Sequence, residues 1–144
     1  MAFLPDSQGG LLPYFLLYTS LSALLHSAIC YLRPAPTTMT MFTTGPSTST
    51  SSSSPPPTPL LAHTYAVKNF YTGLIRLYAA YHIADPKLYD LAIATYVGVV
   101  WLYGTETFKY KTVGFEKGGS LIPLVQAGGG VVWMVLQRGG YVVG

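Results

Sequence analysis

The stretch "NFYTGLIRLYAAYHIADPKLYD", residues 69–90, indicates two apolar helices joined by a tight turn. Pro86 disfavours helix at the residue before it, so the "DPK" tripeptide separates a run at 62–84 from a second run at 88–108. Arg76 stands inside the first run, where neither lipid nor an apolar protein interior readily accepts a guanidinium. The fold of this chain has to accommodate that arginine.

The composition of the whole chain favours a membrane protein. Of its 144 residues, 50% are hydrophobic and 9% are charged, and the mean hydropathy is +0.38. A soluble domain usually carries about 25% charged residues, so this chain has too few to cover a water-exposed surface. The formal net charge of +3 comes from scattered cations rather than from a basic patch, which argues against nucleic-acid binding.

Two further apolar segments complete the predicted architecture. Residues 11–32 match the length of a helix that crosses about 30 Å of hydrocarbon. Residues 120–137 form a shorter segment, interrupted by Pro123 and by three consecutive glycines. Together with residues 62–84 and 88–108, these segments predict an all-α membrane protein, a four-transmembrane-helix antiparallel bundle in one domain.

Residues 33–61, between the first two predicted helices, have a different composition. Of the 24 residues from 36 to 59, 20 are Ser, Thr or Pro. Such a segment buries too little apolar surface to offset the entropy of ordering it, so we expect a disordered loop. A plain spacer and a phosphorylated regulatory loop both fit this composition.

The distribution of positive charge between the predicted loops gives an orientation. Cytoplasmic loops carry an excess of Lys and Arg. The first and third loops carry four cations and the opposite side carries two, so we expect the first and third loops to face the cytoplasm. The four are Arg33, Lys109, Lys111 and Lys117, and the two are Lys87 and Arg138.

The surroundings of Arg76 predict that it points into the bundle. Residues three and four positions away share its helical face, and small residues on a face let a neighbouring helix approach closely. An ionisable residue at membrane depth is a functional candidate, although a structural contact between helices fits equally well. The small neighbours of Arg76 on this face are Thr72, Gly73, Ala79 and Ala80.

Counting from the turn predicts which residues lie at equal depth. Arg76 lies eight residues before the end of its helix, about 12 Å at 1.5 Å per residue, and the same count on the next helix reaches Tyr96. By the same count, Lys68 lies close in depth to Glu106, so a contact between these two is geometrically feasible. The candidate intramembrane polar anchors are Arg76 and Glu106, and the choice of Glu106 rests on the family resemblance set out below rather than on this count.

Tyrosines recur every seven residues on the third predicted helix, at Tyr89, Tyr96, Tyr103 and Tyr110. A seven-residue repeat drifts by only about 20° per step, so the four rings share one face. We will call them the tyrosine stripe. They can pack between helices with their hydroxyls bonded inside the bundle, or they can form an aromatic contact face for partner helices or a flat, rigid lipid such as a sterol.

No motif for catalysis, a cofactor or a metal ion stands out. No two of His26, His63 and His82 are four residues apart, and Cys30 is the only cysteine. The glycine run in "AGGGVV" lies in an apolar span rather than after a strand, so it does not predict a phosphate site. The sequence therefore favours a protein that is not an enzyme.

From residue 61 onward the chain resembles the ergosterol biosynthetic protein 28 family. The resemblance rests on "AHTYAVKNF", "LIRLYAAY", "ADPKLYDL", "TYVGVVWLYGTETF" and "WMVLQRGGY", which follow in order through three predicted spans. It departs from the family pattern at His63, Lys68 and Leu102 and in the Ser/Thr/Pro-rich loop. The positions that match recurring family residues are Ala62, Thr64, Arg76, Pro86, Glu106, Pro123, Trp133 and Met134.

The resemblance implies a non-catalytic, multi-pass scaffold of the endoplasmic reticulum membrane that holds sterol C-4 demethylation enzymes together. The implied partners are the sterol C-4 methyl oxidase, the decarboxylating sterol-4-carboxylate 3-dehydrogenase and the 3-keto sterol reductase, with the sterol C-24 methyltransferase as a further candidate. The alternative is a small sterol- or lipid-binding carrier or a channel-like subunit, in which Arg76, Glu106 and the tyrosines would line a cavity.

Overall fold

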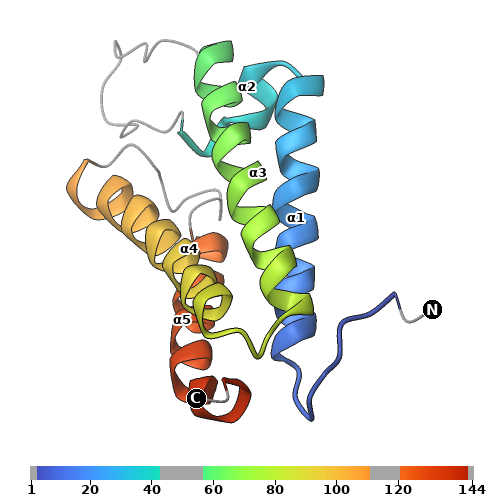
Figure 1. Ribbon diagram of the computed structural model, residues 1–144. Coiled ribbons are helices and arrows are strands. Elements are labelled where there is room, and N and C mark those ends of the chain that lie inside the picture. The colour runs from blue at the N-terminus through green and yellow to red at the C-terminus, as the bar shows by residue number, and fades with distance from the viewer. Residues whose placement is uncertain (1–2, 43–56, 111–120, 143–144) are drawn as a thin grey trace.

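The computed structural model describes residues 3–42, 57–110 and 121–142, and within these ranges every regular element is helical. Four long helices make up the body of the protein, with short helical turns beside them (Figure 1). The long helices are α1 (Leu12–Leu32), α3 (Pro59–Tyr81), α4 (Pro86–Gly104) and α5 (Leu121–Tyr141), and the short ones are α2 (Ala35–Thr38), η1 (Thr40–Phe42) and η2 (Thr105–Lys109), a π-helical turn that continues α4.

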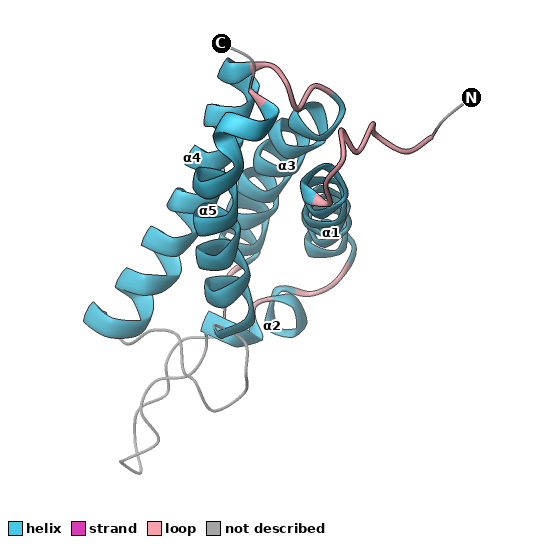
Figure 2. Cartoon of the chain, turned by 90° about the horizontal axis from the view of Figure 1, so that it is seen from below, coloured by secondary structure: helices cyan, strands magenta, loops and turns pink. Residues whose placement is uncertain are grey.

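Helix α3 occupies the middle of the molecule. It packs along α1 on one side and contacts α4 on the other, and α4 packs against α5 (Figure 2). Successive long helices run in opposite directions (Figure 1). The protein is thus built from two helix pairs, α1 with α3 and α4 with α5, joined where α3 meets α4.

The turn between α3 and α4 forms at the "DPK" tripeptide, as predicted. The Asp85 carboxylate accepts hydrogen bonds from the backbone N–H groups of Lys87 at 2.8 Å and Leu88 at 3.2 Å. These bonds satisfy donors that the first helical turn leaves without intrahelical partners. Pro86 occupies the first helical position, where its missing N–H costs nothing.

The pairing of α1 with α3 depends on small residues. The Ser20 hydroxyl donates to the Gly73 carbonyl and the Ser27 hydroxyl donates to the Ala66 carbonyl, each at 2.7 Å. A Cβ atom at Gly73 would lie 3.0 Å from Leu24 Cγ and 3.2 Å from the Ser20 carbonyl oxygen. The two backbones therefore approach closely because position 73 has no side chain, in the manner of small-residue packing in membrane helices.

Two of the described helices are long and apolar enough to cross a membrane, namely α1 and the continuous stretch Pro86–Lys109 formed by α4 and η2. The sequence led us to expect four. Helix α3 is long enough, but polar residues, among them Lys68, Asn69 and Arg76, lower its mean hydropathy. Glycine and glutamine residues lower the mean hydropathy of α5. The polar residues of α3 lower its hydropathy but face its neighbours, because Asn69 and Arg76 are buried.

Part of the segment expected to be a disordered loop, residues 33–61, is helical in the structure. It contains α2 and η1, and the Met39 side chain between them is fully buried in a small cluster with Cys30 and Ala66. Helix α3 also begins inside this segment, at Pro59, with the Thr58 hydroxyl accepting from its first turn. Apolar residues interrupt the Ser/Thr/Pro composition there, and they bury themselves against α1 and α3. Residues 43–56 of the expected loop lie outside the described residues, as do Lys111 and Lys117, which entered the predicted orientation.

Candidate functional site

Arg76 lies inside the protein and joins α3 to α4. Its Nε donates a hydrogen bond of 2.9 Å to the Thr95 hydroxyl, and its guanidinium carbon lies 3.9 Å from the centroid of the Tyr96 ring. The residue is 7% exposed. The Thr95 hydroxyl donates its own hydrogen bond to the Ala92 carbonyl within α4 at 2.7 Å, so its oxygen is oriented to accept from Arg76. The small neighbours Ala79 and Ala80 are buried on the same helix.

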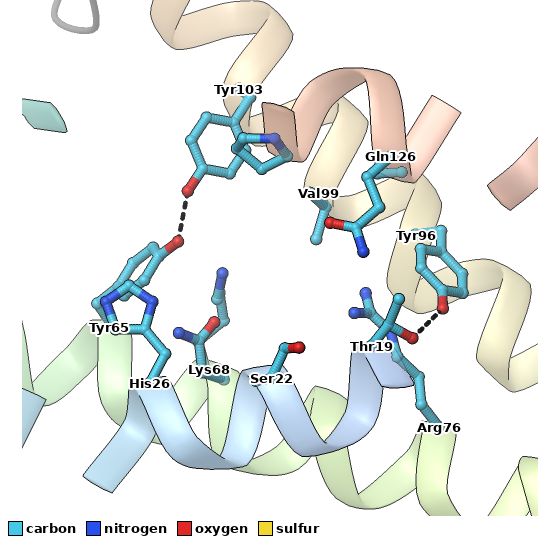
Figure 3. Close-up of a pocket in the computed structure, with 14 residues that line it drawn as sticks. Thr19, Ser22, His26, Tyr65, Lys68, Arg76, Tyr96, Val99, Tyr103 and Gln126 are labelled. Carbon is cyan, nitrogen blue, oxygen red and sulfur yellow. Dashed lines mark hydrogen bonds between the residues drawn. The ribbon is translucent and has the colours of Figure 1, made fainter. Parts of the chain in front are cut away.

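Tyr96 extends this contact to α1. Its hydroxyl is hydrogen-bonded to the Thr19 hydroxyl (Figure 3). Its ring stacks against Phe15, with the two centroids 5.8 Å apart. Arg76, Tyr96 and Thr19 therefore connect α3, α4 and α1 in sequence. A cation held on an aromatic face is stabilised by the ring quadrupole, most strongly where water is excluded.

A cavity of about 150 Å³ lies beside this contact, between α1, α3, α4 and α5. Figure 3 shows the side chains that converge on it, with Lys68 and Arg76 rising from α3 and Gln126 reaching in from α5. Aliphatic side chains, including Val99 and Ala127, fill out the lining. The residues that give the cavity its polar character include His26, Lys68, Arg76, Tyr96, Tyr103 and Gln126.

The cavity is electropositive. Nη2 of Arg76 is buried and has no hydrogen-bond partner among the described residues. The Lys68 ammonium lies over the Tyr65 ring, 4.1 Å from its centroid. Among the described residues of the lining, none is an Asp or a Glu. Buried charge without a counter-ion is costly, so the arrangement favours occupation of the cavity by negative charge or by water.

The structure separates the tyrosine stripe into two parts. Tyr89, Tyr96 and Tyr103 are buried, whereas Tyr110 is 59% exposed. The Tyr89 hydroxyl donates to the Met134 carbonyl of α5 at 2.7 Å, and the Tyr103 and Tyr65 hydroxyls are hydrogen-bonded to each other. Three of the four rings thus pack between helices, which is the first of the two roles considered above. A partner contact through the stripe stays a prediction, and its accessible part is Tyr110.

Glu106, the second predicted anchor, lies in the π-helical turn η2 and is half-buried. It is not among the described residues that line the cavity, whereas Lys68, its predicted neighbour in depth, is. The structure therefore brings together Arg76, Lys68 and the middle of the tyrosine stripe, and it places Glu106 beyond them. A π-helical turn inside an α-helix is uncommon and often marks a functional position.

Sequence reasoning missed several residues of the cavity, including His26, Asn69 and Gln126. The available signal was their polarity, since each is a polar residue in a largely apolar helix. Their convergence could not be predicted, because it depends on how the helices are rotated. Within the described residues, no group of three or more His, Cys, Asp or Glu side chains could hold a metal ion.

Comparison with known proteins identifies the family of this chain. Residues 12–132 match the family model described as "Erg28 like protein". The chain belongs to this family. The match covers α1, α3, α4 and most of α5, and so includes every helix that lines the cavity.

Curated relatives carry one name. The chain is 29% identical over 141 residues to ergosterol biosynthetic protein 28 of Candida albicans, an alignment that covers 98% of this chain and 95% of the relative. It is 27% identical over 129 residues to the protein of that name in Saccharomyces cerevisiae, covering 90% of this chain and 81% of the relative. A third, from Gibberella zeae, is 32% identical over 85 residues, covering 59% of this chain and 49% of the relative. No solved structure matches the chain.

Proposed function

We propose that this protein is a non-catalytic scaffold of the endoplasmic reticulum membrane that tethers sterol C-4 demethylation enzymes during sterol biosynthesis. The observation that carries the proposal is the family match over residues 12–132, together with relatives that are named for ergosterol biosynthesis. The enzymes to be held are the sterol C-4 methyl oxidase, the decarboxylating sterol-4-carboxylate 3-dehydrogenase and the 3-keto sterol reductase. The sterol C-24 methyltransferase is a further candidate.

The proposal includes four membrane passes. Helices α1 and α4 have the length and hydropathy of spans. Helices α3 and α5, with 23 and 21 residues, have the length but less apolar sequences. Because α3 buries Arg76 and Asn69 against its neighbours, it can cross the bilayer without presenting these groups to lipid. In this arrangement α3 crosses as the inner helix of the bundle.

The scaffold would act by raising effective concentration. Enzymes held side by side in the membrane meet each other's products locally, so the next step does not depend on diffusion across the bilayer. Contact area for such partners is available at the end of α4 and in η2. Large side chains there are exposed, with Trp101 at 75% and Phe108 at 69%, and Tyr110 lies beside them. Aromatic residues contribute strongly to protein interfaces.

The alternative function, a carrier for a whole sterol, draws on the cavity. The lining contains Arg76, Tyr96 and Tyr103, which the carrier hypothesis calls for, but Glu106 is not among its described residues. Its volume of about 150 Å³ is nevertheless well below the roughly 300–1,000 Å³ of pockets that enclose a drug-sized ligand. The size of this cavity therefore argues against a carrier that encloses a whole sterol within it.

Complementation in yeast tests the proposed function. We would express this chain in Saccharomyces cerevisiae lacking its own ergosterol biosynthetic protein 28 and measure sterol intermediates by mass spectrometry. We expect the chain to lower the level of C-4-methylated intermediates towards that of the parent strain. A chain that accumulates in the membrane and leaves these intermediates unchanged would contradict the proposal. Turnover of C-4-methylated sterols by the purified protein alone would contradict its non-catalytic part.

A further inference from the structure

The cavity between the helices has the features of a binding site for an anion. The guanidinium of Arg76 is more than nine-tenths buried, and its Nη2 has no hydrogen-bond partner among the described residues. Figure 3 shows this group and the Lys68 ammonium directed into the same space. Because the described lining contains no Asp or Glu, the two cations are not neutralised from within the cavity.

Lys68 and Arg76 are the lysine and arginine donors of the lining, which also carries the side-chain amides of Asn69 and Gln126. The Tyr65 and Tyr103 hydroxyls are hydrogen-bonded to each other, and the Tyr96 hydroxyl is hydrogen-bonded to Thr19. A small oxyanion with two oxygens offers one acceptor to each of these two cations. Hydrogen bonds in which both partners are charged are about twice as strong as neutral ones.

The position and size of the cavity indicate which part of a ligand it can hold. Its walls include residues of α1 and α4, the two helices that are long and apolar enough to cross a membrane. Aliphatic residues, among them Ala23, Val99 and Ala127, share the lining with the cations. The volume of about 150 Å³ admits a head group and a few carbons but not a complete lipid. The ligand therefore has its charge inside and its apolar body outside.

We propose that this cavity binds the carboxylate head group of an amphiphile, with Arg76 and Lys68 as the groups that hold it. This is a ligand site in addition to the proposed scaffold function, and it does not depend on that function. The carboxylate would supply the missing partner of Arg76 Nη2. It would also neutralise the positive charge that the fold buries between its helices.

The test uses the full chain purified in a non-ionic detergent, with binding and stoichiometry followed by native mass spectrometry. The probes are hexadecanoate, hexadecanol, hexadecyl phosphate and acetate. The variants are Lys68→Met and Arg76→Met, with Arg33→Met, at an exposed arginine after α1, as the matched control. Lys68→Met is included because it removes a cation whose described contact is a ring face rather than a hydrogen bond, so it leaves no hydrogen-bonding group without its partner.

We expect one hexadecanoate per chain and binding at least tenfold weaker in Lys68→Met and Arg76→Met, with Arg33→Met unchanged. Hexadecanol, hexadecyl phosphate and acetate should all bind more weakly than hexadecanoate. Equal binding of the acid and the alcohol, or hexadecanoate binding that neither cavity variant weakens, would overturn the proposal. Tighter binding of the phosphate would overturn the assignment to a carboxylate, and equally tight binding of acetate would overturn the amphiphile. These binding measurements are independent of the sterol intermediates measured in yeast. A negative binding result would therefore not contradict the proposed scaffold function.

Discussion

Glycine at position 73 controls how closely α1 and α3 pack, and replacing it with alanine tests the geometry of this helix pair. A Cβ atom there would lie 3.0 Å from Leu24 Cγ and 3.2 Å from the Ser20 carbonyl oxygen. The leucine can shift by rotation, whereas the carbonyl belongs to the backbone of α1. The matched control is Gly98→Ala in the interior of α4, where an added Cβ meets nothing within 4 Å.

The expected loss of stability follows from comparing the free energies of unfolding of the two variants. Replacing glycine by alanine inside a helix stabilises it by about 0.8–1 kcal/mol, and this gain applies at both positions. Forcing an extra methyl group into a packed interface costs roughly 1–3 kcal/mol, and this cost applies at Gly73 alone. The gain cancels in the difference, so Gly73→Ala should be about 1–3 kcal/mol less stable than Gly98→Ala.

Unfolding by sodium dodecyl sulphate in mixed micelles, followed by far-ultraviolet circular dichroism, measures both free energies under one condition. A larger residue should extend the trend, so Gly73→Leu should unfold at a lower detergent fraction than Gly73→Ala. If Gly73→Ala and Gly98→Ala prove equally stable, α1 and α3 do not approach as closely as described. The packing account of this helix pair would then be refuted.

Three further predictions concern α4. Tyr89→Phe removes the buried hydroxyl that is hydrogen-bonded to α5 and should lower the free energy of unfolding by roughly 0.5–1.5 kcal/mol. Tyr110→Phe, at an exposed ring, should change this free energy little. Equal effects of the two variants in the same unfolding assay would contradict the placement of the two rings. Asp85→Ala removes the N-cap of α4 and should lower the free energy of unfolding by about 0.5–2 kcal/mol, whereas Asp85→Asn retains an acceptor and should keep most of the stability. If Asp85→Asn lowers the free energy of unfolding as much as Asp85→Ala, capping is not the cause. The exposed Asp90–Arg138 ion pair, 2.7 Å long, should show only a small coupling in a double-alanine cycle, and the coupling should weaken with added salt. A large, salt-independent coupling would show that the pair is shielded from solvent.

Local signals in the sequence predicted the elements of this fold well. The "DPK" turn needs only an N-capping carboxylate and a proline at the first helical position, and both are neighbours in sequence. Counting from that turn placed Arg76 at the depth of Tyr96, and the two are in contact. Such counts succeed because the helical rise is constant and the hairpin fixes the register of its two helices.

The arrangement of the candidate site was harder to predict from the sequence. Depth alone does not determine rotation, so the same count did not show that the Lys68 ammonium lies over Tyr65. The contact of Lys68 with Glu106 stays a prediction. The cavity collects residues from four helices, and Gln126 and His26 reach it from segments that are distant in sequence. The helical turns in residues 33–42 were also unforeseen, because a Ser/Thr/Pro composition concealed apolar residues, among them Met39, that pack against the helices.

Co-purification from mild detergent tests the scaffold most directly. The chain would be isolated beside Arg76→Leu, Glu106→Gln and the exposed control Arg33→Leu, and the accompanying proteins identified by mass spectrometry. The account predicts that sterol C-4 demethylation enzymes accompany the parent and the control, and that at least one anchor variant that accumulates normally recovers less of them. Recovery of none of these enzymes with the parent chain, with a sterol bound in their place, would contradict it.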